Sequence, residues 1–520
     1  MDYIIVQAGG KGTRLKRLTK NKPKALVPVN NLPMLFRLFR KYPEKRFVII
    51  ADYHKEVLRK YLSSFAKVKY QVVDANGTGT ASGIRQALEL IPENNPFMLI
   101  WSDLILPTDF RLPASYEEEN GIPTEDYIGI SGTFPCRWKY ENGVFKEERS
   151  VKQGVAGFFL FTEKKRIEDV PQSGELVRWM QEKKMCFSEC SLKGTKEYGL
   201  LEEYEKLGQE RCRPFNRITI DGSVLTKEPV DEQGRRLAVK ECAWYEKARS
   251  LKINILPQIY DTDPLRMEKI CGRNIYEYHL SHEEKRKILE KLIDSLHVLH
   301  RMETVPSDSF SLKEAYFCKT MDRLSRIEDL VPYARERSIR INGRTCRNVF
   351  YYKDQLEKRL ESLRCDRFCF IHGDCTFSNL MLREDGSPVL IDPRGYFGYT
   401  ELYGDARYDW AKLYYSIIGN YDHFNLKDFC LEIGGADRIP GSSRGAEAKC
   451  LPEGEIQLEI TSNGWEDMEE DFFCLIGVEP EEIKLLHAII WLSLTTYAWQ
   501  DYDSVCGAFY NGLYYLEEIL

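Results

Sequence analysis

The segment 372-HGDCTFSNLML-382, followed by the strand end 389-VLID-392, decides the fold of the second half of this chain. Transfer of a phosphoryl group needs a carboxylate that receives the proton of the attacking hydroxyl. It also needs a carboxamide and a second carboxylate to hold the magnesium that bridges the ATP phosphates. We expect Asp374 to be the base, and Asn379 and Asp392 to bind Mg²⁺.

A second and unrelated nucleotide signature, 8-AGGKGTR-14, opens the same chain. Glycines after a buried strand let the backbone approach an anion, and main-chain N–H groups there can cradle phosphate. A glycine run alone would fit a plain tight turn equally well. This run continues into Thr19, 23-PKALVPV-29 and 33-PML-35, and the added residues make the pattern specific. The two signatures together predict two consecutive reactions on one polypeptide.

The composition is that of a globular protein with small charged partners. A length of 520 residues suggests roughly two to four domains. Lysine plus arginine number 74 against 80 aspartate plus glutamate, and the net charge of -6 gives no bulk attraction to nucleic acid or to an anionic membrane. The fifteen cysteines include no CxxC pair, which favours reduced thiols over a disulfide frame or a zinc site.

Neither a leader nor a membrane span is expected. The first apolar strand begins almost at Met1, which leaves no room for a signal peptide. The apolar segment 485–499 is short for a bilayer span and contains polar side chains, so we expect a buried helix. Together with the cysteine usage, these features predict a cytoplasmic protein.

Alternating apolar strands and amphipathic stretches in the first part of the chain predict an α/β domain with a largely parallel, Rossmann-like sheet. The expected strands are 4–6, 47–51, 69–73, 97–101, 127–132 and 157–161. A helix over about 199–207 is expected to close this domain. The polar segment 208–211 is the expected linker, which divides the chain into domains 1–209 and 210–520.

The second part predicts a two-lobed α+β domain, with a small lobe over 210–270 and a large lobe over 271–520. From residue 215 the pattern is strand, turn at 221–222, strand, and a helix that contains 237–249. After residue 270 it becomes mostly helical. Residues 434–458, rich in glycine, serine, proline and charge, are expected to form a surface excursion between helices.

The N-terminal motifs resemble those of nucleotidyltransferases that join a nucleoside triphosphate to a sugar 1-phosphate or phosphocholine, over roughly the first two hundred residues. The resemblance implies that Arg14 holds the phosphates that leave as pyrophosphate and that Lys24 neutralises the α-phosphate under attack. It implies further nucleotide contacts from the glycine-rich loop and from a Gly-Thr-Ala turn near the base and ribose. These nucleotide-binding residues are Ala8, Gly9, Gly10, Gly12, Gly79, Thr80 and Ala81.

Asp103, just after the strand 97–101, matches the magnesium-binding aspartate of this family. A carboxylate at the carboxyl end of a strand is where such a fold places chemistry. Many members have a second metal aspartate just before a Gly-Thr pair, but Leu192 precedes the pair here. Leucine cannot bind magnesium. Either the second metal is held differently, for instance by substrate phosphate alone, or this half is impaired.

The chain from about residue 215 onward resembles the aminoglycoside phosphotransferase and choline kinase superfamily, which has a protein-kinase-like fold. The resemblance implies that Lys227 grips the α- and β-phosphates and that Glu241 on the next helix is its ion-pair partner. Glu268 and Ile270, where the small lobe ends, are also expected to bind nucleotide.

Other residues near the phosphoryl-transfer motif are assigned supporting or acceptor roles. His372 is expected to support the loop, and Asp405 to brace it rather than touch substrate. Arg394 stands where choline kinases carry an acidic and aromatic segment. A quaternary ammonium is best held by aromatic faces and carboxylates, and an arginine would repel it. Arg394 is therefore a candidate to contact an anionic or hydroxyl-rich acceptor, with a structural salt bridge as the alternative.

A kinase makes a phosphomonoester and a nucleotidyltransferase consumes one, so the pairing predicts successive steps. We expect ATP to phosphorylate a sugar or small alcohol, and a second nucleoside triphosphate to convert the product into an NDP-activated precursor for cell-surface glycan synthesis. One alternative is a choline or amino alcohol kinase joined to a CTP:phosphocholine cytidylyltransferase. Another is an active kinase whose N-terminal domain senses nucleotide without catalysis. The sequence makes no prediction of oligomeric state.

Overall fold

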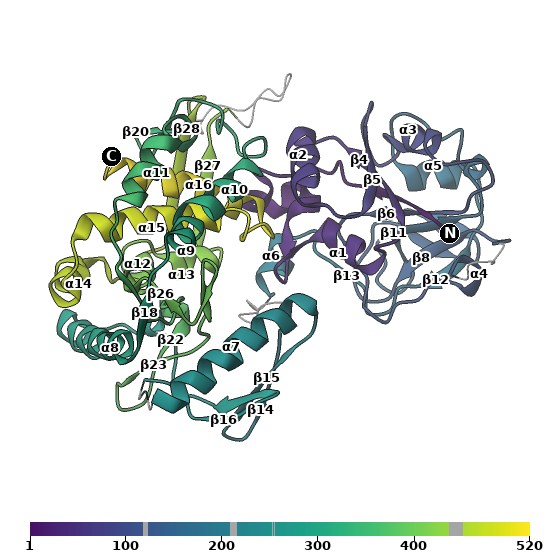
Figure 1. Cartoon of the computed structure of the whole chain (residues 1–520). Coiled ribbons are helices and arrows are strands. Elements are labelled where there is room, and N and C mark those ends of the chain that lie inside the picture. Colours follow the sequence, from purple (N-terminus) through teal and green to yellow (C-terminus); the bar gives the residue numbers. More distant parts are fainter. Residues whose placement is uncertain (118–122, 208–215, 252, 254, 436–450) are drawn as a thin grey trace. The chain divides into compact units, whose positions relative to one another are not determined.

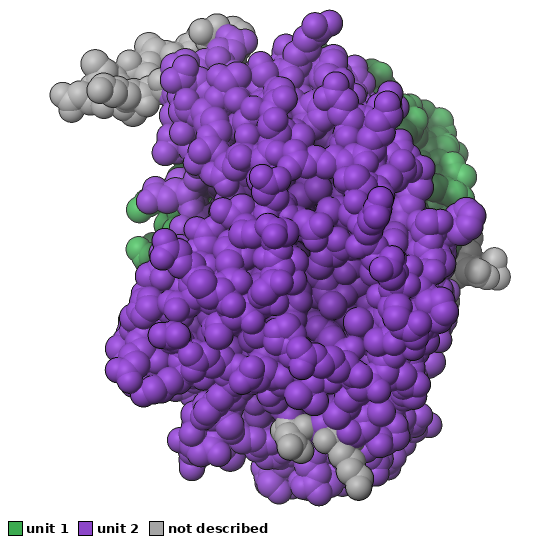
Figure 2. Space-filling view, turned by 60° about the vertical axis from the view of Figure 1, so that its left-hand side comes forward, with its two compact units in different colours: residues 1–208, 500–502 green, residues 209–499, 503–520 purple. Residues whose placement is uncertain are grey.

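The computed structural model describes residues 1–117, 123–207, 216–251, 253, 255–435 and 451–520. Contacts divide the chain into two compact units, which Figure 2 colours separately. Unit 1 comprises residues 1–208 and 500–502, and unit 2 comprises 209–499 and 503–520. The expected linker at 208–211 lies outside the described residues.

Unit 1 is built on a mixed β-sheet with the order β10-β9-β11-β6-β1-β4-β5, in which β8 also joins β11 to β12 (Figure 1). Strands β6, β1, β4 and β5 run parallel, as predicted, whereas β11 runs antiparallel to β6. The strands are β1 (Tyr3–Gln7), β4 (Arg46–Ala51), β5 (Lys69–Asp74), β6 (Phe97–Trp101), β8 (Tyr127–Ser131), β9 (Lys139–Glu141), β10 (Val144–Lys146), β11 (Gly154–Phe161) and β12 (Ser188–Ser191).

The central strand of this sheet, β1, is buried on both faces. Ile4, Ile5 and Val6 have no exposed surface, and such a continuous apolar run is typical of a parallel strand covered on both sides. The helices and short strands around the sheet are β2 (Pro28–Val29), β3 (Leu32–Pro33), α1 (Met34–Lys41), α2 (Lys55–Phe65), α3 (Ile84–Glu89), β7 (Leu104–Ile105), α4 (Ala114–Glu117), α5 (Leu176–Glu182), β13 (Lys196–Glu197) and α6 (Leu201–Glu205).

Unit 2 has a small and a large lobe and the kinase-like fold that the sequence predicts. The small lobe is an antiparallel sheet with the order β14-β15-β17-β16, and α7 packs against it (Figure 1). Its elements are β14 (Asn216–Asp221), β15 (Val224–Pro229), α7 (Glu232–Leu251), β16 (Ile259–Thr262) and β17 (Leu265–Glu268). Trp244 of α7 is fully buried, stacks on Phe370 and donates from Nε1 to the carbonyl of Ile371 (2.7 Å). This contact ties α7 to β21 (Arg367–Phe370), the strand that precedes residues 372–379, which form the predicted catalytic loop.

The large lobe is mostly helical, with α12 and α15 packed together in its core. The predicted buried helix is α15, in which residues 485–492 have almost no exposed surface. The helices are α8 (His282–Met302), α9 (Ser309–Lys313), α10 (Lys319–Ser325), α11 (Lys353–Glu361), α12 (Ala406–Ile417), α13 (Tyr421–Asn425), α14 (Glu469–Ile476), α15 (Pro480–Leu494) and α16 (Tyr502–Glu517). No helix in the described part of the chain is long and apolar enough to cross a membrane.

The strands of the large lobe lie in short sheets between these helices. They are β18 (Thr304–Pro306), β19 (Ser338–Ile341), β20 (Arg344–Arg347), β21 (Arg367–Phe370), β22 (Leu380–Leu382), β23 (Pro388–Leu390), β24 (Tyr396–Phe397), β25 (Thr400–Glu401), β26 (Tyr403–Gly404), β27 (Phe429–Ile433) and β28 (Glu455–Ile460).

Most of the excursion expected at 434–458, residues 436–450, lies outside the described residues, but the elements on either side of it are strands and not the helices that were expected. β27 and β28 pair antiparallel, and β28 also pairs with β19. Ile456 and Leu458 are buried while the residues between and after them are exposed, which is the period-two pattern of a half-buried strand. The surrounding glycine, proline and charge hide this short pattern in the sequence.

Candidate active sites

The glycine-rich loop of unit 1 begins where β1 ends, at the edge of the sheet where open α/β folds bind ligands. Ala8 N donates to the carbonyl of Ile50 on β4 (3.0 Å), which anchors the start of the loop. A Cβ at Gly9 would lie 2.8 Å from Asp52 Cβ, so a larger residue would not fit there. Gly12 has a φ of 60°, in the left-handed region that glycine adopts without strain.

The Gly-Thr-Ala turn is held at the same edge of the sheet by Gln7, the last residue of β1. Gln7 Nε2 donates to the carbonyls of Thr80 and Ser82, each at 3.0 Å. Gly79 has a φ of 85°, and a Cβ there would collide with the carbonyl of Gly174. The structure therefore brings the predicted turn beside the glycine-rich loop. Gln7 was not predicted, because its role depends on a contact across about seventy residues of sequence.

Lys24 and Asp103 meet in an ion pair with little exposed surface. Asp103 follows β6, the neighbour of β1, so both loops open at one edge of the sheet. Lys24 lies in a short 3-10 helix that begins after Pro23. Arg14 is exposed at the start of another 3-10 helix, η1 (Thr13–Thr19). The predicted cations and carboxylate of unit 1 are thus placed around one part of the sheet edge.

Glu197 is a carboxylate in this group that the sequence analysis missed. It lies on β13, which pairs with β7 directly after Asp103. A Cβ at Gly199 would collide with Glu197 Oε1 and would lie 3.2 Å from Lys24 Nζ, so both charged groups face the same space. Burial raises the pKa of Glu197, and the nearby Asp103 raises it further, while Lys24 and Arg14 oppose the shift.

Leu192, at the position of the missing aspartate, belongs to the core. It has no exposed surface, and a Cβ at Gly129 would lie 2.7 Å from Leu192 Cδ1. Its side chain therefore packs against the β8 backbone. The carboxylate that faces Asp103 in this chain is Glu197, five residues further on. Its position in β13 has no sequence signal of its own.

The catalytic loop of unit 2 is braced by Asp409 of α12. Asp409 accepts from the backbone N–H groups of His372 (2.9 Å) and Gly373 (2.7 Å), and it bonds His300 Nε2 at 3.0 Å. Burial alone would raise the pKa of Asp409, but the bond with His300 and the loop N–H groups holds it below its ordinary value. Burial lowers the pKa of His372, whose Nδ1 accepts from the backbone N–H of Asp374 (3.3 Å).

The prediction that Asp405 braces this loop is wrong. Asp405 caps the N-terminus of α12, bonds the Arg407 guanidinium and accepts from the hydroxyl of Tyr316 (3.0 Å). Two aspartates four residues apart lie one turn apart on a helix, and the sequence does not say which of them faces the loop. The structure assigns the bracing role to Asp409.

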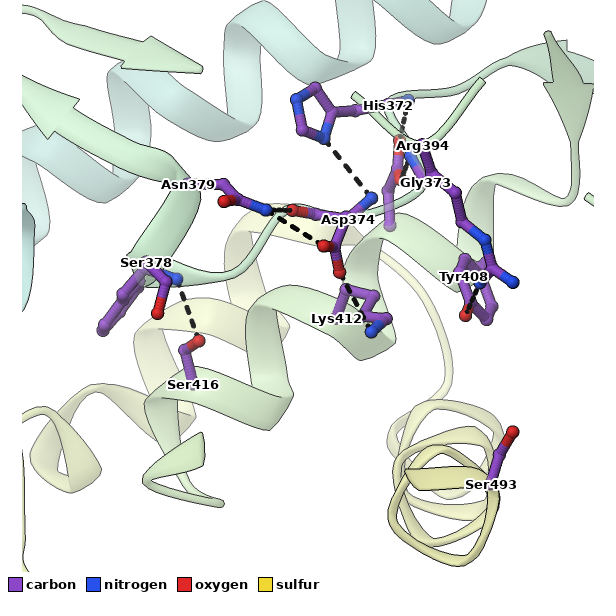
Figure 3. A network of polar contacts seen from close by, with 12 residues as sticks. His372, Gly373, Asp374, Ser378, Asn379, Arg394, Tyr408, Lys412, Ser416 and Ser493 are labelled. Carbon is purple, nitrogen blue, oxygen red and sulfur yellow. Dashed lines mark hydrogen bonds and ion pairs between the residues drawn. The ribbon is translucent and has the colours of Figure 1, made fainter. Parts of the chain in front are cut away.

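Asp374 lies between an amide and an ammonium group (Figure 3). Its Oδ2 accepts from Asn379 Nδ2 (3.0 Å), and its Oδ1 pairs with Lys412 Nζ (3.0 Å). Burial would lower the pKa of Lys412, but Asp374 and nearby tyrosines raise it above its ordinary value, so this lysine is a fixed cation. Lys412 comes from α12 and was not predicted.

The expected ion pair between Lys227 and Glu241 is present, with Lys227 Nζ 2.9 and 2.8 Å from the two carboxylate oxygens. Lys227 also pairs with Asp392 Oδ1 at 2.8 Å, so one ammonium group joins β15, α7 and the end of β23. Asp392 has a φ of 56°, a left-handed conformation that non-glycine residues adopt at a cost of about 1–3 kcal/mol, often at functional sites.

The two residues expected to bind nucleotide at the end of the small lobe have other partners or are buried. The Glu268 carboxylate is bound by the guanidinium of Arg383, with Nη2 2.8 Å from Oε2, and it also accepts from the backbone N–H of Gln258 (3.1 Å). Ile270 is 8% exposed. The side chain of Glu268 therefore links β17 to the end of β22.

Side-chain oxygens that suit magnesium as ligands lie at the predicted positions in unit 2. Asn379 donates through Nδ2, which leaves Oδ1 as its acceptor atom, and the side chain of Asp392 is 43% exposed. Among the described residues, no group of three or more His, Cys, Asp or Glu side chains could hold a metal ion. Magnesium in such sites usually takes one or two carboxylates together with substrate phosphates and water. An amide, a carboxylate and phosphate oxygens therefore fit this ion.

Two family models match the chain. Residues 3–122 match a model described as "Nucleotidyl transferase", and residues 252–430 match one described as "Phosphotransferase enzyme family". The chain therefore contains a nucleotidyl transferase domain followed by a domain of the phosphotransferase enzyme family. Both are families of enzymes.

Curated relatives are similar to part of this chain. The bifunctional protein GlmU of Methanococcus aeolicus is 35% identical over 125 residues, which cover 24% of this chain and 29% of that protein. The D-glycero-alpha-D-manno-heptose 1-phosphate guanylyltransferase of Campylobacter jejuni is 31% identical over 101 residues, which cover 18% of this chain and 45% of that protein. The matches thus span less than half of the length of each of these relatives.

A solved structure similar to this chain is that of the choline kinase LicA from Streptococcus pneumoniae. It is 15% identical, with a TM-score of 0.35, and the similarity covers 59% of this chain and 91% of that one.

Proposed function

We propose that this protein is a bifunctional enzyme that phosphorylates a sugar or small alcohol with ATP in unit 2 and couples the product to a second nucleoside triphosphate in unit 1. The products are pyrophosphate and an NDP-activated precursor suited to cell-surface glycan synthesis. The domain pair supports this order, because a nucleotidyl transferase of this kind consumes the phosphomonoester that a kinase makes.

In unit 2, the oxygen of the acceptor hydroxyl attacks the γ-phosphorus of ATP, the bond to the bridging oxygen breaks, and ADP leaves. Asp374 receives the hydroxyl proton. Lys227 binds the α- and β-phosphates, in an orientation that its pair with Glu241 fixes. When bound at Asn379 and Asp392, magnesium would neutralise phosphate charge.

The position of Asp374 is the observation that most strongly supports the proposed kinase reaction. One of its oxygens faces the predicted magnesium ligand Asn379, and the other faces the cation Lys412 (Figure 3). A base that receives the proton of the nucleophile must lie between the bound phosphates and the acceptor, and these two contacts support that place for Asp374.

In unit 1, a phosphate oxygen of the monoester attacks the α-phosphorus of the second triphosphate, and pyrophosphate leaves. Lys24 faces the charge that develops at the α-phosphate, and Arg14 binds the departing phosphates. Backbone N–H groups of the loop 9–12 hold the triphosphate. Asp103 would bind the magnesium ion of this site, and its pair with Lys24 keeps both groups in position.

Single substitutions test whether the two activities are separate. We expect Asp374→Ala to abolish ADP formation and to leave pyrophosphate release from a supplied sugar 1-phosphate unchanged. Arg14→Ala should do the reverse. Exposed residues nearby provide controls, because Asp385→Ala and Arg17→Ala should leave both activities unchanged. Loss of both activities in either active-site variant would contradict two independent sites.

Leu192 favours a second candidate function, in which unit 1 binds nucleotide without catalysis. A buried leucine replaces the usual metal aspartate, so unit 1 would lack one metal ligand. The full chain distinguishes the two functions in a pyrophosphate-release assay with each triphosphate and a panel of phosphomonoesters. Release with any pair supports the transferase, whereas saturable triphosphate binding without release supports the sensor.

A further inference from the structure

Four cationic side chains gather beside the predicted base of the kinase site. Arg394 follows Asp392, Lys412 belongs to α12, and Lys319 and Arg323 belong to α10. Arg394 is anchored to the catalytic loop, because its backbone N–H donates to the carbonyl of His372 (2.9 Å). The set comes from elements far apart in sequence, and the fold brings its members together.

Three of these cations have no carboxylate partner among the residues that the structure describes. Arg394 donates to the hydroxyls of Tyr408 (2.5 Å) and Tyr396 (3.0 Å), and Arg323 donates to Ser493. No ion pair between a described carboxylate and Lys319, Arg323 or Arg394 is present, so the salt bridge expected as an alternative for Arg394 is not found there. Only Lys412 is paired, with Asp374.

The positive charges act on one another. Burial lowers the pKa of Lys319 well below its ordinary value, and the charges of Arg394, Arg323 and Lys412 lower it further, while Glu314 opposes the shift only weakly. Burial and Arg394 also lower the pKa of Arg323. Withdrawing like charges from water is costly where they have no directly paired carboxylate, and a bound anion would offset that cost. The cluster is therefore poised to bind an anion.

The cluster lies on the acceptor side of Asp374. Figure 3 shows Asn379 on one side of Asp374 and Arg394 with Tyr408 on the other. The two carboxylate oxygens divide in the same way, with Oδ2 toward Asn379 and Oδ1 toward Lys412. The phosphates of ATP belong with the magnesium ligand and Lys227. The opposite side is left for the molecule that supplies the hydroxyl.

We propose that the acceptor of this kinase carries an anionic group, a phosphate or a carboxylate, in addition to the hydroxyl that is phosphorylated. Lys319, Arg323 and Arg394 bind that group. This rests on the proposed kinase function of unit 2 and specifies its substrate class as sugar phosphates or sugar acids. Choline and amino alcohols are disfavoured, because a partly buried cluster of cations repels a cationic acceptor. Lys412 Nζ lies 5.4 Å from the ring centroid of Tyr415 and 6.0 Å from that of Tyr421. Aromatic rings attract an ammonium group, but Lys412 already occupies these two.

Acceptor binding and turnover test this proposal on the full chain. Binding is measured by calorimetry in the presence of magnesium and ADP, with glucose, mannose and galactose as neutral sugars, as 6-phosphates and as uronates, and with choline. ADP formation from ATP is measured with the same panel. We expect one anionic series to bind and to be phosphorylated at least about tenfold more efficiently than its neutral counterpart. The stronger series identifies the group as phosphate or carboxylate.

Charge-removing variants locate the anion. We expect Lys319→Met and Arg323→Met to raise the KM for the anionic acceptor about tenfold, with no change in the KM for ATP. The control is Arg326→Met, an exposed residue at the end of the same helix, which should change neither constant. Thermal unfolding checks that each variant is folded.

Different results overturn different parts of the account. Equal binding of neutral sugars, or tighter binding of choline, would overturn the anionic acceptor. A rise in the KM for ATP instead of the acceptor would mean that the cations serve the nucleotide phosphates, and would also overturn it. Anion binding at the cluster without ADP formation would support the anionic site while contradicting the kinase function.

Discussion

At the scale of residues, both sites are built from charged groups that hold each other in place. Lys227 joins Glu241 to Asp392 in unit 2, and Lys24 pairs with Asp103 in unit 1. In the proposed reactions these pairs would keep the cations pre-organised for phosphate, so that little reorganisation would be needed on nucleotide binding. All five of these residues were predicted from the sequence motifs, four of them through the family resemblances that the motifs carry.

The carboxylate of Glu197 is expected to support nucleotidyl transfer in place of the residue that Leu192 replaces. It faces the same space as Lys24, beside Asp103. Glu197→Gln keeps the size of the side chain and removes its charge, so we expect pyrophosphate release to fall by at least about tenfold, the effect of one charge-assisted contact. Release is measured with a triphosphate and a phosphomonoester that the unchanged chain accepts.

The matched control is Glu203→Gln, an exposed residue on α6 that pairs only with Lys206 among the described residues. It should release pyrophosphate at the unchanged rate. Wild-type activity in Glu197→Gln would mean that Asp103 and the substrate phosphates are sufficient for nucleotidyl transfer without the charge of Glu197. ADP formation in unit 2 should be unaffected in both variants.

At the scale of elements, the sequence predicted the helices and strands whose apolar pattern is contained in a short stretch of the chain. The parallel strands around β1 read as apolar runs, and α7 reads as an amphipathic helix between a strand pair and a mostly helical region. The β27–β28 pair was missed because short alternation is hidden among glycines and prolines. Lys412 and Glu197 were missed for another reason, since their contacts with Asp374 and the Asp103 region exist only after elements distant in sequence pack together.

The contact between α7 and the catalytic strand is expected to stabilise the small lobe. Trp244→Phe keeps the stacking on Phe370 but removes the Nε1 bond to the carbonyl of Ile371. A buried carbonyl left without its donor costs about 1–3 kcal/mol. Urea unfolding should report a loss of that size. Val239→Ala, at an exposed position of the same helix, should change stability by less than about 0.5 kcal/mol, and an equal loss in both would contradict a specific role of the bond.

At the scale of the whole molecule, a buried histidine is expected to make stability depend on pH. His487 of α15 accepts from Trp491 Nε1 (2.9 Å), and burial lowers its pKa to about 3. In the unfolded chain a histidine takes up a proton below about pH 6.5. Between these values the unfolded state binds more protons, so stability rises with pH and is lost as pH falls below about 6.5, by up to about 1.4 kcal/mol per pH unit.

Urea unfolding of the full chain between pH 5 and 7 measures this slope. His487→Gln should be less stable at neutral pH, because it loses buried contacts, but its stability should fall less steeply with acid. His279→Gln, at an exposed position, should keep the wild-type slope. Parallel slopes in wild type and His487→Gln would show that other groups cause the acid sensitivity.

The two units together are proposed to pass one phosphoryl group from ATP into an activated conjugate. The most direct test supplies ATP labelled with oxygen-18 on the γ-phosphate, a second nucleoside triphosphate, magnesium and the acceptor panel, and analyses the products by mass spectrometry. The account predicts a nucleoside diphosphate conjugate in which the acceptor-side phosphate retains the label. A labelled phosphomonoester that is never converted, or a conjugate without label, would contradict it.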